Sequence, residues 1–273
     1  MPGRTRGGAL GGQTLMQGRG RSRLYSHDRK RGPSSRDRGQ RVGSRLLTAI
    51  ALILLLAIAV SLVLYATLPD VSDAETRVQA LLHAHGGVDT GLPLPSRVGR
   101  AIVAIEDERF YTHHGIDLLA LLRAAHVDLT TPEVQGGSTI TQQLAKALYV
   151  RDDHSLRAKA QMLGLAVELE GHYSKTQILE MYLNAIYYGD GHWGIDQASR
   201  AYFGLSPRTL GWADASLLAG LPQAPSAYAL TRHFARARAR QRHVLTALVR
   251  SGVLTQQAAD AAYAAAATVM HTP

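Results

Sequence analysis

Residues 175–204 read KTQILEMYLNAIYYGDGHWGIDQASRAYFG, and this stretch decides the fold class. Its apolar residues Ile178, Met181 and Tyr182 recur three and four positions apart, which is the spacing of one face of an α-helix. Glycines between positions 189 and 194 then interrupt the pattern before a second helical segment. The stretch therefore predicts a helix, a glycine-rich aromatic loop and another helix.

The same spacing continues on both sides of this stretch. Three further groups show it: Val98, Ile102 and Ile105; Leu118, Leu121 and Leu122; and Leu217, Leu218 and Leu221. Glycine and proline residues separate the groups, and few segments alternate with a period of two. We therefore expect a mainly α protein of seven or more helices, with little or no sheet and no internal repeat.

Composition excludes several classes of site. The 273 residues contain no cysteine, which excludes a disulfide scaffold, a cysteine-ligated zinc site and a cysteine nucleophile. The net charge of +9 is confined to the beginning of the chain, because residues 1–45 hold 12 of the 30 Lys and Arg but only 2 of the 21 Asp and Glu. The other residues are nearly neutral, so the basic character does not indicate nucleic-acid binding.

Residues 46–68 contain no charged side chain and are predicted to form a single transmembrane helix. The run is too long for a signal peptide, and the alternative is a buried core helix. Charged residues flank it: Arg36, Arg38, Arg41 and Arg45 before it, and Asp70, Asp73 and Glu75 after it. Because positive charge stays on the cytoplasmic side, we expect a single-pass protein of the cytoplasmic (inner) membrane with residues 69–273 on its outer or periplasmic face.

These features divide the chain into five parts. We expect a disordered basic cytoplasmic tail at 1–45, the membrane helix at 46–68, a linker at 69–95, a folded domain at 96–250 and a C-terminal helical tail at 251–273. The tail at 1–45 can contact anionic lipid heads. An alanine-rich segment carries four arginines, Arg236, Arg238, Arg240 and Arg242. They predict either a helix face exposed to solvent or a surface that contacts acidic lipid head groups.

The segment 101–117, AIVAIEDERFYTHHGID, ends an apolar helical turn with Glu106. A carboxylate beside apolar residues is partly desolvated, which raises its pKa and suits it to accept a proton. The alternative interpretation of Glu106 is an ordinary carboxylate on the protein surface. The same segment contains His113, which we interpret as a hydrogen-bonding side chain rather than as a metal ligand.

The segment 136–146, GGSTITQQLAK, combines two glycines with hydroxyl side chains before a helix. Ser138 or Thr139 can cap that helix. The free N–H groups at its start, the hydroxyls and Lys146 can then face an anion. The segment is not a Walker motif, because no GKS or GKT is present.

Taken together, these segments resemble the peptidoglycan glycosyltransferase domain, the lysozyme-like transglycosylase of penicillin-binding proteins and of monofunctional cell-wall transglycosylases. Five ordered motifs carry the resemblance, which covers about residues 96–250. They are E-D-x-x-F-x-x-H-x-G at Glu106, Asp107, Phe110, His113 and Gly115; G-G-S-T-I-T-Q-Q at 136–143; I-L-E-x-Y-L-N-x-I-Y-Y-G at 178–189; Y-F-G at 202–204; and L-P-Q-A-P-S at 221–226. The resemblance implies a mainly α, lysozyme-like domain, here preceded by one transmembrane helix.

One family motif is altered. Where the family has R-K-x-x-E, this chain has Ala158, Lys159 and Met162, and an upstream arginine of the family's pyrophosphate site falls at His154. The missing carboxylate is implicated in the family's donor site through a divalent cation, so Mg²⁺ or Mn²⁺ is the candidate cofactor. The thioether of Met162 cannot bind a hard cation or accept a proton. Either Glu106 acts alone, or the activity is weak, or another acidic residue compensates: Asp152, Asp153 or Glu168.

The resemblance implies an enzyme of cell-wall biogenesis and cell shape that polymerises lipid II into glycan strands by inverting transfer, releasing polyprenyl pyrophosphate. Glu106 would be the base, and Lys146 and Lys159 would stabilise the pyrophosphate, with Arg151 or Arg157 replacing the lost arginine. The implied substrate-binding residues are Asp107, Phe110, His113, Ser138, Thr139, Gln142, Gln143, Lys146, Lys159 and Asn184.

The sequence lacks the S-x-x-K, SDN and KTG motifs of a transpeptidase, so we expect a monofunctional enzyme. Its partners would be lipid II, the nascent glycan strand, the membrane and a separate transpeptidase, but no nucleic acid. One alternative is a weakened or inactive relative that binds lipid-linked precursor or scaffolds cell-wall synthesis. Another is a lysozyme-like glycan-cleaving enzyme with Glu106 as general acid.

Overall fold

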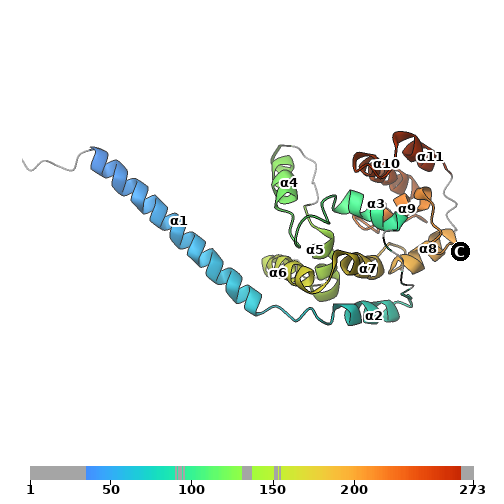
Figure 1. Cartoon of the computed structure of the whole chain (residues 1–273), viewed down its shortest axis with the longest axis horizontal. Coiled ribbons are helices and arrows are strands. Elements are labelled where there is room, and N and C mark those ends of the chain that lie inside the picture. The colour runs from blue at the N-terminus through green and yellow to red at the C-terminus, as the bar shows by residue number, and fades with distance from the viewer. Residues whose placement is uncertain are drawn as a thin grey trace, which may run out of the picture. The chain divides into compact units, whose positions relative to one another are not determined.

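The computed structural model describes residues 35–89, 91, 94, 96–130, 137–150, 153 and 155–265 (Figure 1). Within these residues the backbone forms twelve helical elements and no strand, apart from two isolated β-bridges. The prediction of a mainly α protein is therefore confirmed.

The chain divides into two units, residues 1–56 and 57–273. Helix α1 (Ser35–Ala66) begins in the first unit and ends in the second. Its large apolar side chains, such as Leu52 and Ile53, are exposed. Among the described residues, none of the helices combines the length and the hydropathy that a membrane span requires, and the span at 46–68 stays a prediction. Residues 1–34 of the predicted disordered tail at 1–45 lie outside the described residues, and its residues 35–45 are helical and form the start of α1.

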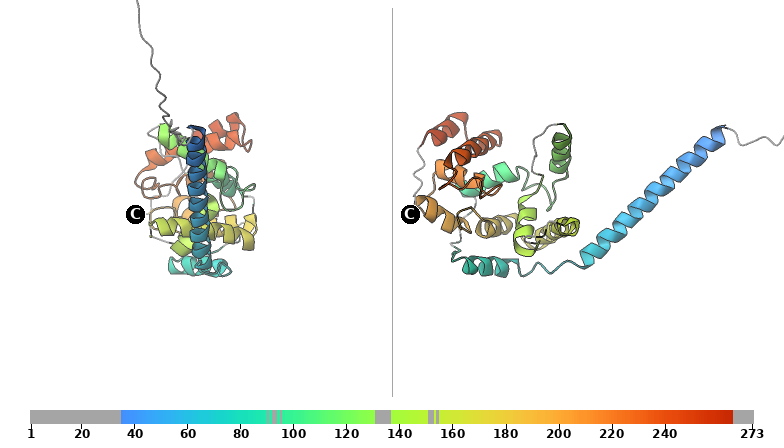
Figure 2. Two further views of the ribbon diagram at one scale, coloured as in Figure 1. Left: turned by 90° about the vertical axis from the view of Figure 1, so that its left-hand side faces the viewer. Right: turned by 180° about the vertical axis from the view of Figure 1, so that it is seen from behind.

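Two groups of helices build the second unit (Figures 1 and 2). The first group packs around α9 and comprises α3 (Arg97–Glu106), α9 (Trp212–Gly220), α10 (Phe234–Arg250) and α11 (Gln256–Ala264). The second group comprises α2 (Ala74–Ala84), α5 (Ile140–Ala145), the π-helical turn η1 (Lys146–Val150), α6 (Leu156–His172) and α7 (Lys175–Ala185). Helix α8 (Ile195–Phe203) contacts α7 and α9 and so connects the groups, and α4 (Leu118–Thr130) follows α3 in the chain.

Side-chain caps fix where the important helices start. The hydroxyl of Ser96 accepts a hydrogen bond from the Gly99 N–H at the start of α3. Capping boxes begin α5, with Thr139 and Gln142, and α7, with Ser174 and Gln177. Each cap satisfies N–H groups that the helix itself leaves unpaired. The Ile140 N–H in the first turn of α5 donates a hydrogen bond to Asp107 Oδ2 at 3.0 Å, which sets that turn beside the end of α3.

Helix α2 belongs to the core although it lies inside the predicted linker at 69–95. Its residues Ala74, Val78 and Leu82 are buried and stand one helical turn apart. The hydroxyl of Tyr173 donates hydrogen bonds to the Val71 and Ser72 carbonyls just before the helix. This part of the segment is therefore a packed element. The predicted helical tail at 251–273 contains α11, and residues 266–273 lie outside the described residues.

Candidate active site

Glu106 is the last residue of α3, and its side chain, only 10% exposed, meets the second helix group. Gln143 Nε2 donates a hydrogen bond to Glu106 Oε2 at 2.9 Å, and Arg240 Nη2 donates to Oε1 at 3.3 Å. Burial raises the pKa of Glu106, while the Gln143 hydrogen bond and the Arg240 charge oppose that rise only in part. The structure thus provides a carboxylate that is more basic than an ordinary glutamate.

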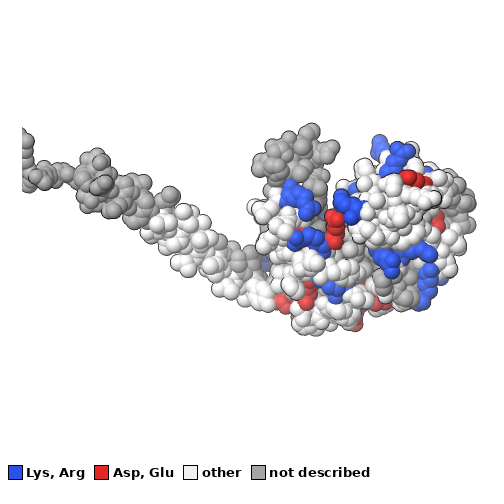
Figure 3. All heavy atoms as spheres, turned by 45° about the horizontal axis from the view of Figure 1, so that its top comes forward, with Lys and Arg blue, Asp and Glu red and all other residues white. Residues whose placement is uncertain are grey.

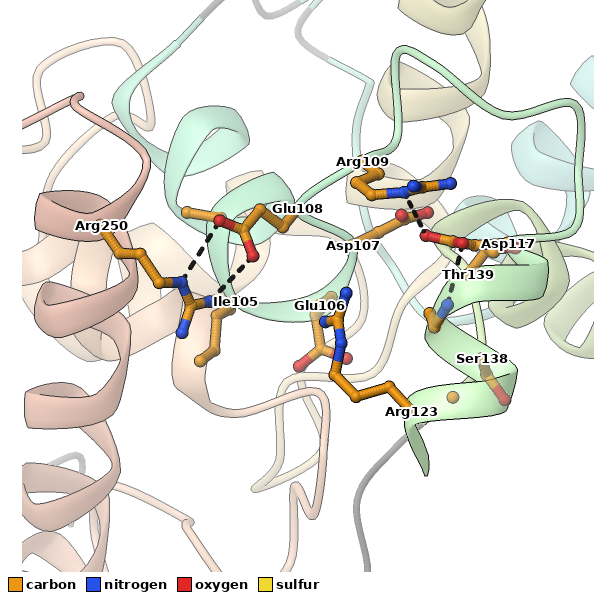
Figure 4. A pocket seen from close by; sticks show the side chains of 13 residues that line it. Ile105, Glu106, Asp107, Glu108, Arg109, Asp117, Arg123, Ser138, Thr139 and Arg250 are labelled. Carbon is orange, nitrogen blue, oxygen red and sulfur yellow. Dashed lines mark hydrogen bonds and ion pairs between the residues drawn. The ribbon is translucent and has the colours of Figure 1, made fainter. Parts of the chain in front are cut away.

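Two cavities border Glu106. The larger, of about 790 Å³, is the cleft; beside Glu106 it is lined by Ser138, Gln143, Lys146 and Met162. The smaller, of about 110 Å³, is polar and is drawn in Figure 4. In the space-filling view, Lys and Arg side chains stand on both sides of a hollow that also shows acidic atoms (Figure 3). Glu106 can therefore contact molecules in either cavity.

Gln143 is held in place from the opposite side. The hydroxyl of Tyr182, which is fully buried, donates to Gln143 Oε1 at 2.9 Å. The amide oxygen is thereby occupied as an acceptor, and the amide nitrogen faces Glu106. Gln143 consequently positions Glu106 as well as lining the cleft.

Aromatic rings also line the cleft. The His85 ring stacks on Trp193 with centroids 4.5 Å apart and planes 12° apart, and Tyr187 lies 5.0 Å from Trp193. His85 follows α2, and all three residues line the cleft. The lining of the cleft thus combines the charged side chains of Glu106 and Lys146 with aromatic rings.

Arginines surround the smaller cavity. Arg109 pairs with Asp117 at 2.9 Å, and Arg250 pairs with Glu108 at 3.1 Å (Figure 4). Arg123 also lines the cavity, and it makes no ion pair or hydrogen bond with the residues that the structure describes. Arg123 is therefore available to bind an anion next to Glu106, and sequence analysis did not single it out.

Three residues of the first motif support the site from beneath. His113 Nε2 lies 2.9 Å from the Asp107 carboxylate, which also accepts a hydrogen bond from the Ile140 N–H of α5. Phe110 is fully buried, with Lys175 Nζ 4.4 Å from its ring centroid. Asp107 borders the smaller cavity, whereas His113 and Phe110 line neither of the two. These contacts fix α5 against the end of α3.

Thr139 and Gln142 hold the start of α5. Thr139 Oγ1 donates to the Gly115 carbonyl at 2.7 Å and accepts from the Gln142 N–H at 3.1 Å. Gln142 is buried, and its Nε2 lies 3.4 Å from the same carbonyl. Thr139 borders the smaller cavity, and Gln142 lines neither cavity.

The remaining predicted residues lie in three places. Lys146, at the start of η1, lines the cleft. Lys159 is exposed on α6 and is not among the residues lining the cleft, although Met162, one helical turn further on, is. Asn184 lines a separate cavity between α2 and α7. The structure therefore brings Ser138, Gln143 and Lys146 to Glu106, and leaves Asn184 elsewhere.

No described acidic side chain takes the place of the family's second carboxylate. Ala158 is buried in α6, and Glu106 is the one carboxylate among the described residues that line the cleft. Asp153 is exposed and accepts the Ser155 N–H at 2.8 Å, and Glu168 is partly buried on α6; neither lines the cleft. Arg157 is exposed on α6, while Arg151, Asp152 and His154 lie outside the described residues. One carboxylate and a thioether do not fit a hard divalent cation.

The predicted solvated face of α10 requires a correction at Arg240. Its side chain is 12% exposed and pairs with Glu106, and Arg238 and Arg242 lie over the Tyr263 ring at 3.9 Å and 4.5 Å. Arg240 stands three residues after buried Ala237 and four before buried Val244. The helical period alone therefore placed Arg240 on the buried face.

Comparisons with known proteins agree with these motifs. The family model described as Transglycosylase matches residues 88–249. Penicillin-binding protein 2D of Bacillus subtilis (strain 168) is 44% identical over 162 residues, 59% of this chain and 23% of that protein. Penicillin-binding protein 1A of Escherichia coli (strain K12) is 39% identical over 168 residues, 61% of this chain and 20% of that protein. The chain thus spans about a fifth to a quarter of the length of these relatives.

A relative of more similar length is a protein of Cupriavidus necator named as a transglycosylase, 40% identical over 169 residues, 62% of this chain and 73% of that protein. A crystal structure of penicillin-binding protein 1A from Haemophilus influenzae aligns with 26% identity and a TM-score of 0.35, covering 48% of this chain and 16% of that one. The family model and the Cupriavidus relative confirm the resemblance found in the motifs, and the chain belongs to the transglycosylase family.

Proposed function

We propose that this chain is a peptidoglycan glycosyltransferase that polymerises lipid II into glycan strands and releases polyprenyl pyrophosphate. One observation carries the proposal: Glu106 is buried, has a raised pKa and borders both the cleft with Lys146 and the small cavity with Arg123. Glu106 thus lies between two cavities, each lined by a positively charged side chain. This arrangement suits a reaction in which a base activates one substrate for attack on another and an anion is released. Membership in the transglycosylase family supports the same activity.

The reaction is a single inverting displacement. A Glu106 oxygen accepts the proton of the acceptor sugar's 4-hydroxyl, and that hydroxyl oxygen forms a bond to the anomeric carbon of the donor. The bond between the anomeric carbon and the pyrophosphate oxygen breaks, and its electron pair leaves with the pyrophosphate. Lys146 and Arg123 stabilise the developing negative charge. Ser138 and Gln143 orient the sugars, and Lys159 and Arg157 add positive charge on α6.

The other motif residues act through the framework. Asp107, His113 and Phe110 hold the end of α3, and Thr139 and Gln142 hold α5. No step is assigned to Mg²⁺ or Mn²⁺, because Met162 and a single carboxylate are poor ligands for such ions.

We place this reaction at the outer face of the cytoplasmic membrane, with residues 46–68 as the anchor. Both substrates carry lipid, so an anchored enzyme searches for them in two dimensions. The Cupriavidus relative, named as a transglycosylase and covered over 73% of its length, supports a transglycosylase that leaves peptide cross-linking to a partner transpeptidase.

Labelled lipid II tests the proposal directly. Polymer formation by the purified full chain is expected, with Glu106→Gln lowering the rate by about 10²- to 10⁴-fold because the base is lost. Glu168→Gln, which removes a carboxylate that does not line the cleft, should retain the rate. Full polymerisation by Glu106→Gln would show that the base assignment is wrong.

A second candidate function is binding of the lipid-linked precursor without catalysis, and Met162 in the cleft favours it. Binding of labelled lipid II with no polymer from the wild-type chain would identify that function. Fragments from finished glycan would instead identify a lysozyme-like hydrolase.

A further inference from the structure

A third cavity, of about 320 Å³, lies between α2 and α7 and shares no lining residue with the cleft. Its size falls near the lower end of the range for small-molecule sites. Glu75 comes from the first turn of α2, Asp89 from the segment after α2, and Glu180 from α7. Three separate segments therefore direct carboxylates to one concave surface, and none of the described residues that line it is basic.

The carboxylates are close enough to influence one another. Burial raises the pKa of Glu180, and the negative charges of Asp89 and Glu75 raise it further. Gln79 Nε2 donates to Asp89 Oδ2 at 2.9 Å, and Gln177 Nε2 lies 3.4 Å from Glu75 Oε1. Glu180 makes no ion pair or hydrogen bond within the described part of the chain, so its charge is left uncompensated.

Asn184 provides an independent indication of a ligand. Asn184 is 96% buried as a residue and lines the cavity, and its side chain makes no hydrogen bond with any residue that the structure describes. Because the residue borders the cavity, its amide can be satisfied there by water or by a bound ligand. The Asn184 amide is thus available to a molecule in the cavity.

We infer that this cavity binds an organic cation through a primary ammonium group, carried either on a peptide side chain or on a free alkylamine. An ammonium group has three N–H donors and no acceptor, which matches carboxylate oxygens and an amide oxygen. Within the described residues, no group of three or more His, Asp or Glu side chains is arranged to hold a metal ion, and the cavity has room for an alkyl chain. The inference goes beyond the proposed function, and its test does not require polymerisation.

Calorimetric titration of the full chain in detergent tests the site with three probes. Nα-acetyl-lysine methylamide presents the ammonium on a peptide unit, cadaverine presents it on a free diamine, and Nα,Nε-diacetyl-lysine methylamide is the neutral control. We expect one or both cations to bind and the neutral compound not to bind. The tighter of the two cations identifies the source of the ammonium group.

Variants locate the binding. Glu180→Gln and Asn184→Ala should each weaken binding by about tenfold, since each removes a strong acceptor. Asp260→Asn removes the same charge from exposed α11 and should leave the affinity unchanged. Asp89→Asn provides a second carboxylate variant if circular dichroism shows that Glu180→Gln is unfolded. Equal binding of the neutral compound, displacement of the cation by equimolar Mg²⁺, or unchanged affinity in the folded carboxylate variants would overturn the inference.

Discussion

Glu106 experiences two opposing influences, and burial is the larger. The proposed base must be ionised, so the rate is lost as the pH falls through the pKa of Glu106. Because Arg240 lowers that pKa, Arg240→Met should raise it further and shift the acidic limb of the rate profile to higher pH. Initial polymerisation rates measured across pH would check this, with Arg236→Met, exposed on the same helix, as the control. A limb that stays in place or moves to lower pH would contradict the role given to Arg240.

Met162 allows a test of cation dependence. We expect polymerisation by the wild-type chain to be insensitive to EDTA, because the cleft offers a hard cation only one carboxylate. Met162→Glu adds hard oxygen ligands beside Lys146, so its rate should become dependent on added Mg²⁺ or Mn²⁺. Rates with and without chelator for both proteins provide the measurement. A chelator-sensitive wild-type enzyme would show that ligands other than those lining the cleft hold a cation.

For individual residues, the sequence predicted the surroundings of some side chains and missed those of others. The apolar turn before Glu106 correctly indicated a desolvated carboxylate. Arg240 was missed because arginines at alternate positions suggest a solvated surface, although its helical phase with Val244 indicated burial. The separation of Asn184 from Glu106 depends on how α2 covers α7, and no local pattern encodes that packing.

Among the elements, the turn that ends at Gly115 sets the position of α5. Gly115 has φ +80°, and a Cβ there would lie 2.6 Å from the Ala166 carbonyl oxygen. Gly191 has φ +88°, but a Cβ would meet nothing within 4 Å. Gly191→Ala should therefore cost about 1–2 kcal/mol of unfolding free energy from backbone strain alone, and Gly115→Ala should cost several kcal/mol because the backbone must also move. Both variants carry the same backbone strain, so the difference between their unfolding free energies in urea measures the cost of the clash at Gly115. Equal losses of unfolding free energy would contradict the clash.

The elements themselves were largely predictable. The stretch 175–204 forms α7, a glycine-rich loop and α8, as its periodicity indicated. Helix α2 was predicted as part of a linker because nearby glycines and prolines dominate that region. The repeat of Ala74, Val78 and Leu82 was the signal that could have identified it.

For the whole molecule, the folded body extends beyond the family match at 88–249. A protein comprising residues 69–273 should unfold at the same temperature as the folded body of the full chain. One comprising 88–273 should be less stable by several kcal/mol, because it loses buried Val78 and Leu82, each contributing about 1.5–3 kcal/mol. Thermal unfolding followed by circular dichroism compares the two, and equal stability would show that α2 is dispensable.

The stacked rings that line the cleft give the molecule a built-in optical reporter. The chain has two tryptophans, and Trp193 lines the cleft while Trp212, at the start of α9, does not. A bound molecule can displace water from the indole ring of Trp193 or separate that ring from His85. Either change alters the environment of the excited indole and therefore its fluorescence. In a Trp212→Phe background, intrinsic emission therefore follows occupancy of the cleft in real time, with no label attached to enzyme or sugar.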